Sequence, residues 1–150
     1  MTLTASEVEN LSLLIEQEIY VDAPLDVTFS ALLEQLGPGN EKPDGTPMPF
    51  TLEARPGGRW FRDLGDGDGH FWGNVHAIKR PTLLEFAGPL FMSHPVANNV
   101  QYRLSPEGEG TLIKFRHSGF GLVQDDHKRN VVGGWTYIHD KVRERAEKSR

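Results

Sequence analysis

The sequence predicts an α+β fold in which a curved antiparallel β-sheet wraps around a long C-terminal α-helix. Apolar and polar side chains alternate from Thr111 to His117, which is typical of a strand with one covered face. Strand-like segments separated by turn residues precede it, and their close spacing favours hairpins over crossover connections. After Trp135, apolar residues recur at helical spacing. These three patterns indicate a meander of hairpins covered by one helix.

The first strand and a short helix are expected before residue 37. Residues 12–21 form a mixed run whose later part, 15–21, alternates as a strand does. The spacing of apolar residues changes from that of a strand to that of a helix after Asp22, which we expect to cap the helix. Pro24 predicts that a short helix begins there. Residues 37–49 are rich in proline and glycine and predict a loop. This loop is either a lid over the interior or an inert surface loop.

The middle of the chain predicts six further strands. They span residues 50–55, 59–64, 70–79, 83–87, 96–104 and 111–117. The last element is a helix over residues 125–148 whose buried stripe starts at Trp135. Gly133 and Gly134 fall inside this pattern and predict a kink or close packing of the helix on the sheet.

The 150 residues contain no repeat and no long polar linker, so we expect one domain. Within it, residues 1–12 are expected to form a flexible or weakly structured leader. No cysteine is present, which excludes disulfides, thiolate metal sites and cysteine nucleophiles. The sequence has no secretory signal and no apolar run long enough to span a bilayer, so a cytoplasmic protein is expected.

The formal net charge of −5 argues against binding to nucleic acid. Basic residues are dense only between Lys141 and Arg150, where acidic residues interleave with them. Mixed charges at this spacing are typical of a solvated helix face.

Seven short motifs and their order along the chain resemble those of the START-like, birch-pollen-allergen-like superfamily known as SRPBCC. Within it, the chain is most similar to the branch named after the activator of heat-shock-protein-ninety ATPase. The motifs are Val21-Asp-Ala-Pro24, Pro56-Gly-Gly58, Gly73-Asn-Val75, Pro81 to Phe86, Gly110-Thr-Leu112, His117-Ser-Gly-Phe120 and Gly134-Trp135. The resemblance implies a helix-grip fold with a cavity between the sheet and the last helix. Most bacterial members of this branch have no known chemistry.

Three positions depart from the pattern that the resemblance implies. His139 and Ala146 stand where the family usually has large apolar residues, and Gly88 stands where it often has a tryptophan. All three changes are expected to open or polarise the cavity.

The histidines and carboxylates do not predict a metal site. His70 and His76 share a strand face but are separated by roughly 20 Å of extended chain. The Asp66-Gly-Asp68-Gly69 run lacks the glutamate of a calcium loop, because Ala77 occupies that position. Ser118 and His117 point to opposite sides of a strand, so they form no nucleophilic pair. We therefore expect no metal, no cofactor and no nucleophilic triad.

A ligand site is expected in the cavity between the sheet and the last helix. His117 lies in phase with Ile113 and Phe115, while His139 lies one turn after Trp135, so we expect the two histidines to enter one cavity. There they would orient a polar ligand group or shuttle a proton, or else serve as structural core residues. The predicted ligand-binding residues are Trp60, Phe71, Val75, Phe86, Tyr102, Ile113, Phe115, His117, Trp135, Ile138, His139 and Val142.

Taken together, these features favour a bacterial-type protein that binds a small apolar or amphipathic molecule. One alternative is a cyclase- or hydrolase-like enzyme that uses a pocket histidine. Another is a co-chaperone-like interaction module in contact with a chaperone. A monomer and a homodimer are both compatible with the sequence.

Overall fold

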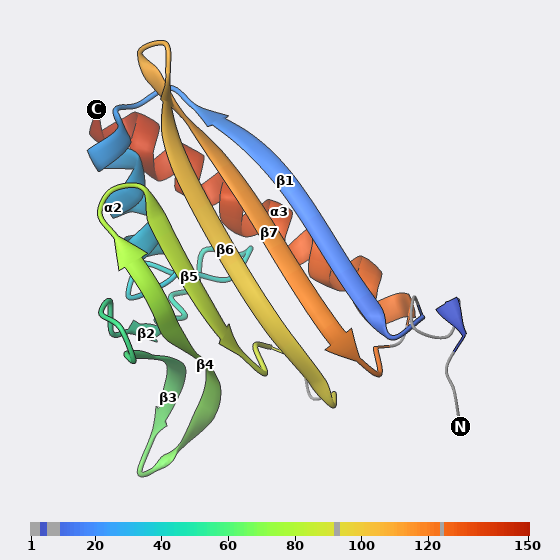
Figure 1. Ribbon diagram of the computed structural model, residues 1–150. Helices are drawn as coiled ribbons and strands as arrows, with labels where there is room; N and C mark the ends of the chain where they lie inside the picture. The colour runs from blue at the N-terminus through green and yellow to red at the C-terminus, as the bar shows by residue number, and fades with distance from the viewer. Residues whose placement is uncertain (1–3, 6–9, 92–93, 124) are drawn as a thin grey trace.

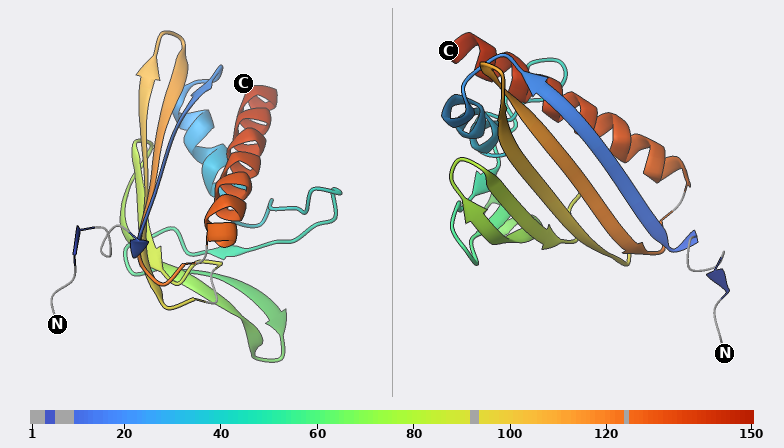
Figure 2. Two further views of the ribbon diagram at one scale, coloured as in Figure 1. Left: turned by 90° about the vertical axis from the view of Figure 1, so that its right-hand side faces the viewer. Right: turned by 45° about the horizontal axis from the view of Figure 1, so that its top comes forward.

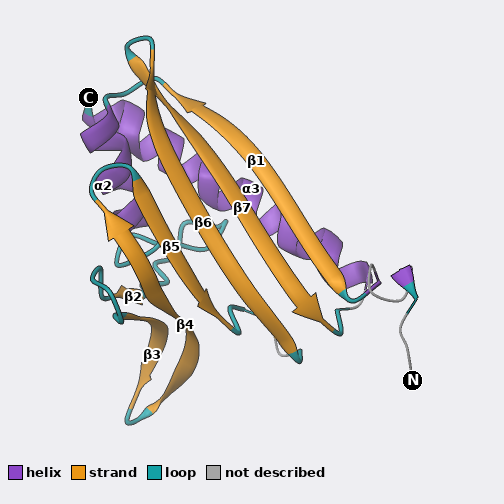
Figure 3. Cartoon of the chain, in the orientation of Figure 1, coloured by secondary structure: helices purple, strands orange, loops and turns teal. Residues whose placement is uncertain are grey.

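The computed structural model describes residues 4–5, 10–91, 94–123 and 125–150. Its main feature is a seven-stranded sheet in which every neighbouring pair of strands is antiparallel (Figures 1 and 3). The strand order is β1-β7-β6-β5-β4-β3-β2. The strands are β1 (Ser12–Val21), β2 (Thr51–Leu52), β3 (Arg59–Gly65), β4 (Asp68–Lys79), β5 (Leu83–Gly88), β6 (Val96–Glu107) and β7 (Gly110–Gly121). The predicted α+β helix-grip layout is confirmed.

Strand β1 forms one edge of the sheet and pairs along its whole length with β7. Its buried side chains alternate with exposed ones such as Glu16 and Glu18, as expected for a strand with one covered face. Charged side chains on an edge strand disfavour pairing with another chain. The strand begins at Ser12, the last residue of the expected leader, while residues 1–3 and 6–9 of that leader lie outside the described residues.

Helix α2 (Leu25–Gln35) follows β1, as predicted, but its start is not capped by Asp22. The N-cap is Pro24, and no side chain caps the helix. Asp22 lies two residues earlier and contacts the other end of the chain instead. Its backbone N–H donates to Oε2 of Glu147 at 2.9 Å, and its carboxylate pairs with Arg150. The capping prediction was therefore wrong, because these contacts hold Asp22 against the end of α3.

Helix α3 (Asp125–Ser149) lies along the concave face of the sheet, on the same side as α2 (Figure 2). The predicted apolar stripe is buried against the sheet, which confirms the helical period. The buried residues are Trp135, Ile138, His139, Val142 and Ala146. The predicted close packing at Gly133 and Gly134 is wrong. Apart from its chain neighbours and the adjacent backbone of α3 itself, a Cβ placed at either position would meet no described atom within 4 Å.

The segment between α2 and β2 is tied down at several points. The indole N–H of Trp60 donates to the carbonyl of Leu36 at 2.7 Å, which fixes the end of α2 on the sheet. Further along, the side chain of Asn40 donates to the carbonyl of Met48 at 3.0 Å. The segment held by these bonds is a loop that leaves the sheet and passes beside α3 (Figure 2).

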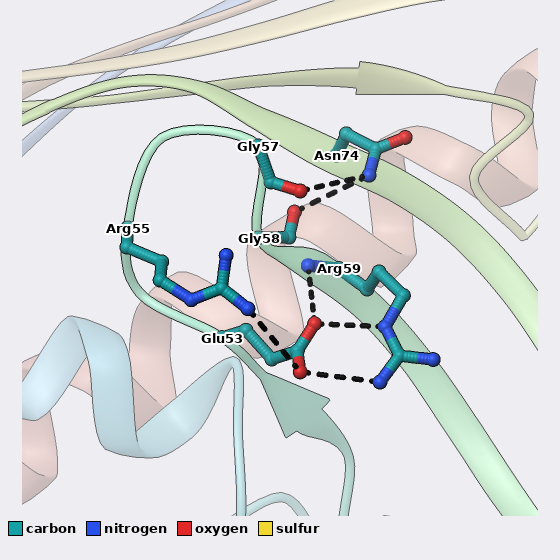
Figure 4. A network of polar contacts seen from close by, with 6 residues as sticks. All are labelled: Glu53, Arg55, Gly57, Gly58, Arg59 and Asn74. Atoms are coloured by element: carbon teal, nitrogen blue, oxygen red, sulfur yellow. Dashed lines mark hydrogen bonds and ion pairs between the residues drawn. The ribbon is translucent and has the colours of Figure 1, made fainter.

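The turn between β2 and β3 is held by polar contacts on the surface (Figure 4). Glu53 accepts hydrogen bonds from the backbone N–H and the guanidinium of Arg59, both at 2.8 Å. Hydrogen bonds from the side chain and the backbone of Arg59 are the main reason that the pKa of Glu53 is lowered to about 2. Asn74 on β4 donates to the carbonyl of Gly57 at 3.2 Å. The turn is therefore anchored to the neighbouring strand.

Candidate functional site

An apolar hollow of about 330 Å³ lies between the first half of α3, the loop 40–50 and strands β3 and β4. Trp72 on β4, Phe91 after β5 and Trp135 on α3 form its floor. The full lining is Asn40, Glu41, Lys42, Pro43, Met48, Phe50, Arg62, Trp72, Phe91, His127, Asn130, Val131, Gly134, Trp135, Tyr137 and Ile138. Its size lies at the lower end of the range of small-molecule pockets.

The floor is built from aromatic rings in mutual contact. The ring centre of Phe91 lies 5.1 Å from that of Trp72 and 5.7 Å from that of Trp135. Phe50 packs edge-on against Trp72 at 4.4 Å. Trp72 and Trp135 are almost fully buried, whereas Phe91 is 40% exposed. The hollow therefore presents an apolar surface that nothing in the described protein covers completely.

On α3, Gly134 lines the hollow next to Trp135. Because it has no side chain and its surroundings are open, the helix leaves room above the floor at this turn. The neighbouring Gly133 is equally open but does not line the hollow.

His117 is fully buried behind this floor. Its Nδ1 accepts a hydrogen bond from the indole N–H of Trp135 at 3.0 Å, and its Nε2 lies 2.7 Å from Oδ1 of Asn98. The first bond leaves Nδ1 without a proton, so the neutral ring donates from Nε2. Burial lowers the pKa of His117 from 6.5 to about 4, which favours the same neutral form.

His139 is held in a similar way on α3. Its Nδ1 lies 2.7 Å from Oε1 of Gln17, and its Nε2 lies 2.9 Å from the hydroxyl of Tyr102. The amide N–H of Gln17 donates to Thr136, which directs its oxygen toward the histidine. The ring therefore donates from Nδ1 and accepts from Tyr102 at Nε2. Burial lowers the pKa of His139 to about 3 and raises the pKa of Tyr102.

Of the twelve predicted ligand-binding residues, Trp135 and Ile138 line the hollow. Phe71 lies away from it, with its side chain 49% exposed. The remaining nine are buried in the core between the sheet and α3. They are Trp60, Val75, Phe86, Tyr102, Ile113, Phe115, His117, His139 and Val142. The structure therefore places the two histidines in the core, and both ring nitrogens of each are bonded to protein groups.

Most of the hollow's lining was not predicted from the sequence. Residues His127, Val131, Gly134 and Ile138 follow each other at spacings of four, three and four, which is a helical stripe. This stripe shares Ile138 with the predicted one, but His127 and Gly134 interrupt its apolar character, so it resembles an exposed face in sequence. Met48 and Phe91 come from loops, where periodicity gives no signal.

Within the described ranges, no three histidines or carboxylates come together as metal ligands would. The same residues include no helical stretch with the length and hydrophobicity that a bilayer crossing requires.

Residues 24–147 match the family model described as "Activator of Hsp90 ATPase homolog 1-like protein". The chain belongs to this family. The match covers most of the sequence and includes α2, all strands after β1 and nearly all of α3. The resemblance stated from the motifs is thereby confirmed at the level of the family.

Solved structures share the fold of this Activator of Hsp90 ATPase homolog 1-like chain. Protein MLL2253 from Mesorhizobium loti is 18% identical, with a TM-score of 0.70 over 91% of this chain and 98% of that one. Ara h 8.0201 is 14% identical, with a TM-score of 0.69 over 90% and 97%. The di-domain ARO/CYC StfQ from the steffimycin biosynthetic pathway is 14% identical, with a TM-score of 0.68 over 96% of this chain and 53% of that one. At these identities the likeness shows the fold alone. No curated protein matches the sequence.

Proposed function

We propose that this protein binds a small apolar or amphipathic molecule in the hollow beside α3. The observation that carries the proposal is the floor of aromatic rings, of which Phe91 remains 40% exposed. Removing apolar surface from water is favourable, and a concave site does so on several sides of a ligand at once.

The hollow is a better candidate than the space around the two buried histidines. The region behind the floor is filled by packed rings, with Phe115 only 4.8 Å from Trp135 and 4.5 Å from His139 between ring centres. A ligand there would have to displace core side chains, which is costly in a close-packed interior. In contrast, a ligand in the hollow leaves the core intact.

The two glycines of α3 provide a matched experiment. Gly134→Leu places a side chain in the hollow, and Gly133→Leu places the same side chain on the same helix outside it. We expect Gly134→Leu to weaken binding of the amphipathic dye anilinonaphthalene sulfonate by about tenfold or more, equivalent to about 1.4 kcal/mol. The dye should bind the Gly133→Leu variant as it binds the unmodified protein.

Fluorescence titration of the three proteins measures these affinities. Equal affinity in all three proteins would place the dye elsewhere and would contradict the proposal. Absence of dye binding to the unmodified protein would contradict it as well.

The alternative functions have less support from the geometry. An acid or base role for His117 or His139 requires a ring nitrogen directed at a ligand, and all four nitrogens are bonded within the protein. A contact with a chaperone, suggested by the family's name, stays a prediction. If the Gly134→Leu variant binds the dye as tightly as the unmodified protein does, a co-chaperone-like interaction module becomes the better supported function.

A further inference from the structure

Two buried polar atoms of the hollow's lining have no hydrogen-bond partner among the described residues. They are Nε2 of His127 and the hydroxyl oxygen of Tyr137. A third such atom, Nε of Arg145, belongs to a residue outside this lining. Buried polar groups in proteins are nearly always paired, so each exception calls for an explanation. Two of these three unpaired atoms belong to residues that line the same hollow.

Both residues project from α3, and Tyr137 follows His127 by ten residues. An α-helix rises 1.5 Å per residue, so the two backbone positions are separated by about 15 Å along the axis. Between them α3 lines the hollow with Asn130, Val131, Gly134 and Trp135. Asn130 is exposed to solvent, and the indole N–H of Trp135 is already bonded to His117. The wall between His127 and Tyr137 therefore carries no other unpaired buried polar atom.

The hydrogen-bonding state of each end follows from its neighbours. Burial, and next the charge of His94, lower the pKa of His127, so its ring is neutral at neutral pH. The rings of His94 and His127 lie 4.6 Å apart. A neutral imidazole nitrogen donates or accepts according to its tautomer. Tyr137 packs its ring against the ammonium of Lys141 at 5.7 Å, and its hydroxyl both donates and accepts.

We propose that the hollow selects an elongated molecule with an uncharged hydrogen-bonding group at each end of an apolar body. Nε2 of His127 binds one end and the hydroxyl of Tyr137 binds the other, while the body lies on Trp72, Phe91 and Trp135. This inference rests on the proposed function and specifies its ligand class. Charged groups of the lining, Lys42, Arg62 and Glu41, carry both signs, so they impose no single charge on the ligand.

Two linear probes of equal length test the inference. An extended chain advances about 3.6 Å for every three bonds, so about twelve bonds span 15 Å. The probes are an unbranched alkane diol of this length, with a hydroxyl at both ends, and the primary alcohol with a hydroxyl at one end only. Their affinities are measured by displacement of anilinonaphthalene sulfonate.

We expect the diol to bind the unmodified protein about threefold to tenfold more tightly than the alcohol, because it makes one more hydrogen bond. An apolar hollow without polar ends would show the opposite order, since the diol is the more hydrophilic molecule. Tyr137→Phe and His127→Leu should each abolish the preference for the diol. The control Tyr20→Phe, which removes a hydroxyl outside the hollow, should retain it.

The outcomes separate this inference from the proposed function. If both probes bind, Gly134→Leu blocks them, and the alcohol binds as tightly as the diol or more tightly, then the hollow binds ligands but the inference about its ends is wrong. A preference for the diol that survives both Tyr137→Phe and His127→Leu would also overturn it. If neither the probes nor the dye bind, the proposed function fails together with the inference.

Discussion

The indole N–H of Trp135 donates to Nδ1 of His117 over 3.0 Å, so a buried hydrogen bond joins α3 to β7. The same tryptophan is almost fully buried and lines the hollow. His117 continues the chain of bonds to Asn98, whose amide donates to the carbonyl of Gly88 at 3.2 Å. The loop that follows Gly88 carries Phe91, the exposed ring of the floor. The core network thus supports two of the three rings on which the proposed ligand lies.

Substitution of Trp135 should separate packing from hydrogen bonding. Trp135→Ala creates a cavity and should lower the free energy of unfolding by roughly 3–5 kcal/mol. Trp135→Phe keeps an aromatic ring but leaves Nδ1 of His117 buried without a donor, and should cost about 1–3 kcal/mol. Urea denaturation measures both. If Trp135→Phe is as stable as the unmodified protein, the indole bond to His117 contributes nothing.

Asn98 should be important for stability, and its neighbour Asn99 provides the control. Asn98→Ala leaves Nε2 of His117 and the carbonyl of Gly88 without their partner, so we expect a loss of about 1–3 kcal/mol. Asn99 is half-buried and its amide lies 3.4 Å from Glu85, so Asn99→Ala should cost less than about 1 kcal/mol. Thermal or urea unfolding of the two variants gives the comparison. Equal losses would show that the network around His117 has no special role.

Stability should fall in mildly acidic solution because both core histidines are held neutral. Burial lowers the pKa of His117 to about 4 and that of His139 to about 3, whereas the value in the unfolded chain is near 6.5. The unfolded chain therefore binds more protons below pH 6.5. The stabilisation is present above that pH and is lost as the pH falls toward the folded-state values. We expect a loss of about 2 kcal/mol between pH 7 and pH 5.5, roughly 1 from each histidine.

The measurement is the free energy of unfolding at a series of pH values in this range. His139→Gln serves as a comparison, because it removes one titrating group and should reduce the slope by about half. A free energy that does not change between pH 7 and pH 5.5 would mean that neither ring is protected from protonation in the folded protein.

Replacing either glycine of α3 by alanine should stabilise the protein. Both positions lie inside a helix and have open space around a new Cβ. Glycine in a helix interior is less favourable than alanine by roughly 0.5–1 kcal/mol, so Gly133→Ala and Gly134→Ala should each raise the free energy of unfolding by about that amount. Calorimetry tests this expectation. A loss of stability at Gly134 alone would show that the hollow is narrower than the structure indicates.

Local patterns in the sequence were sufficient for the order and type of the elements. The alternation from Thr111 to His117 appears as the inner face of β7, and the spacing from Trp135 to Ala146 appears as the buried side of α3. These patterns depend only on neighbours along the chain, which share a strand face or a helix face wherever the element lies. The cap at Asp22 was mistaken because its partners, Glu147 and Arg150, lie at the far end of the chain.

The location of the hollow was decided by the tertiary structure. An aromatic residue on the covered face has the same sequence signal whether it packs in the core, as Trp60 does, or lines the hollow, as Trp72 does. The difference arises where α3, the loop 40–50 and the loop that carries Phe91 meet without filling the volume between them. The sequence alone determined which side chains face inward. How far the segments that cover them approach each other, and so where a ligand has room, depends on contacts between residues that are distant in the chain.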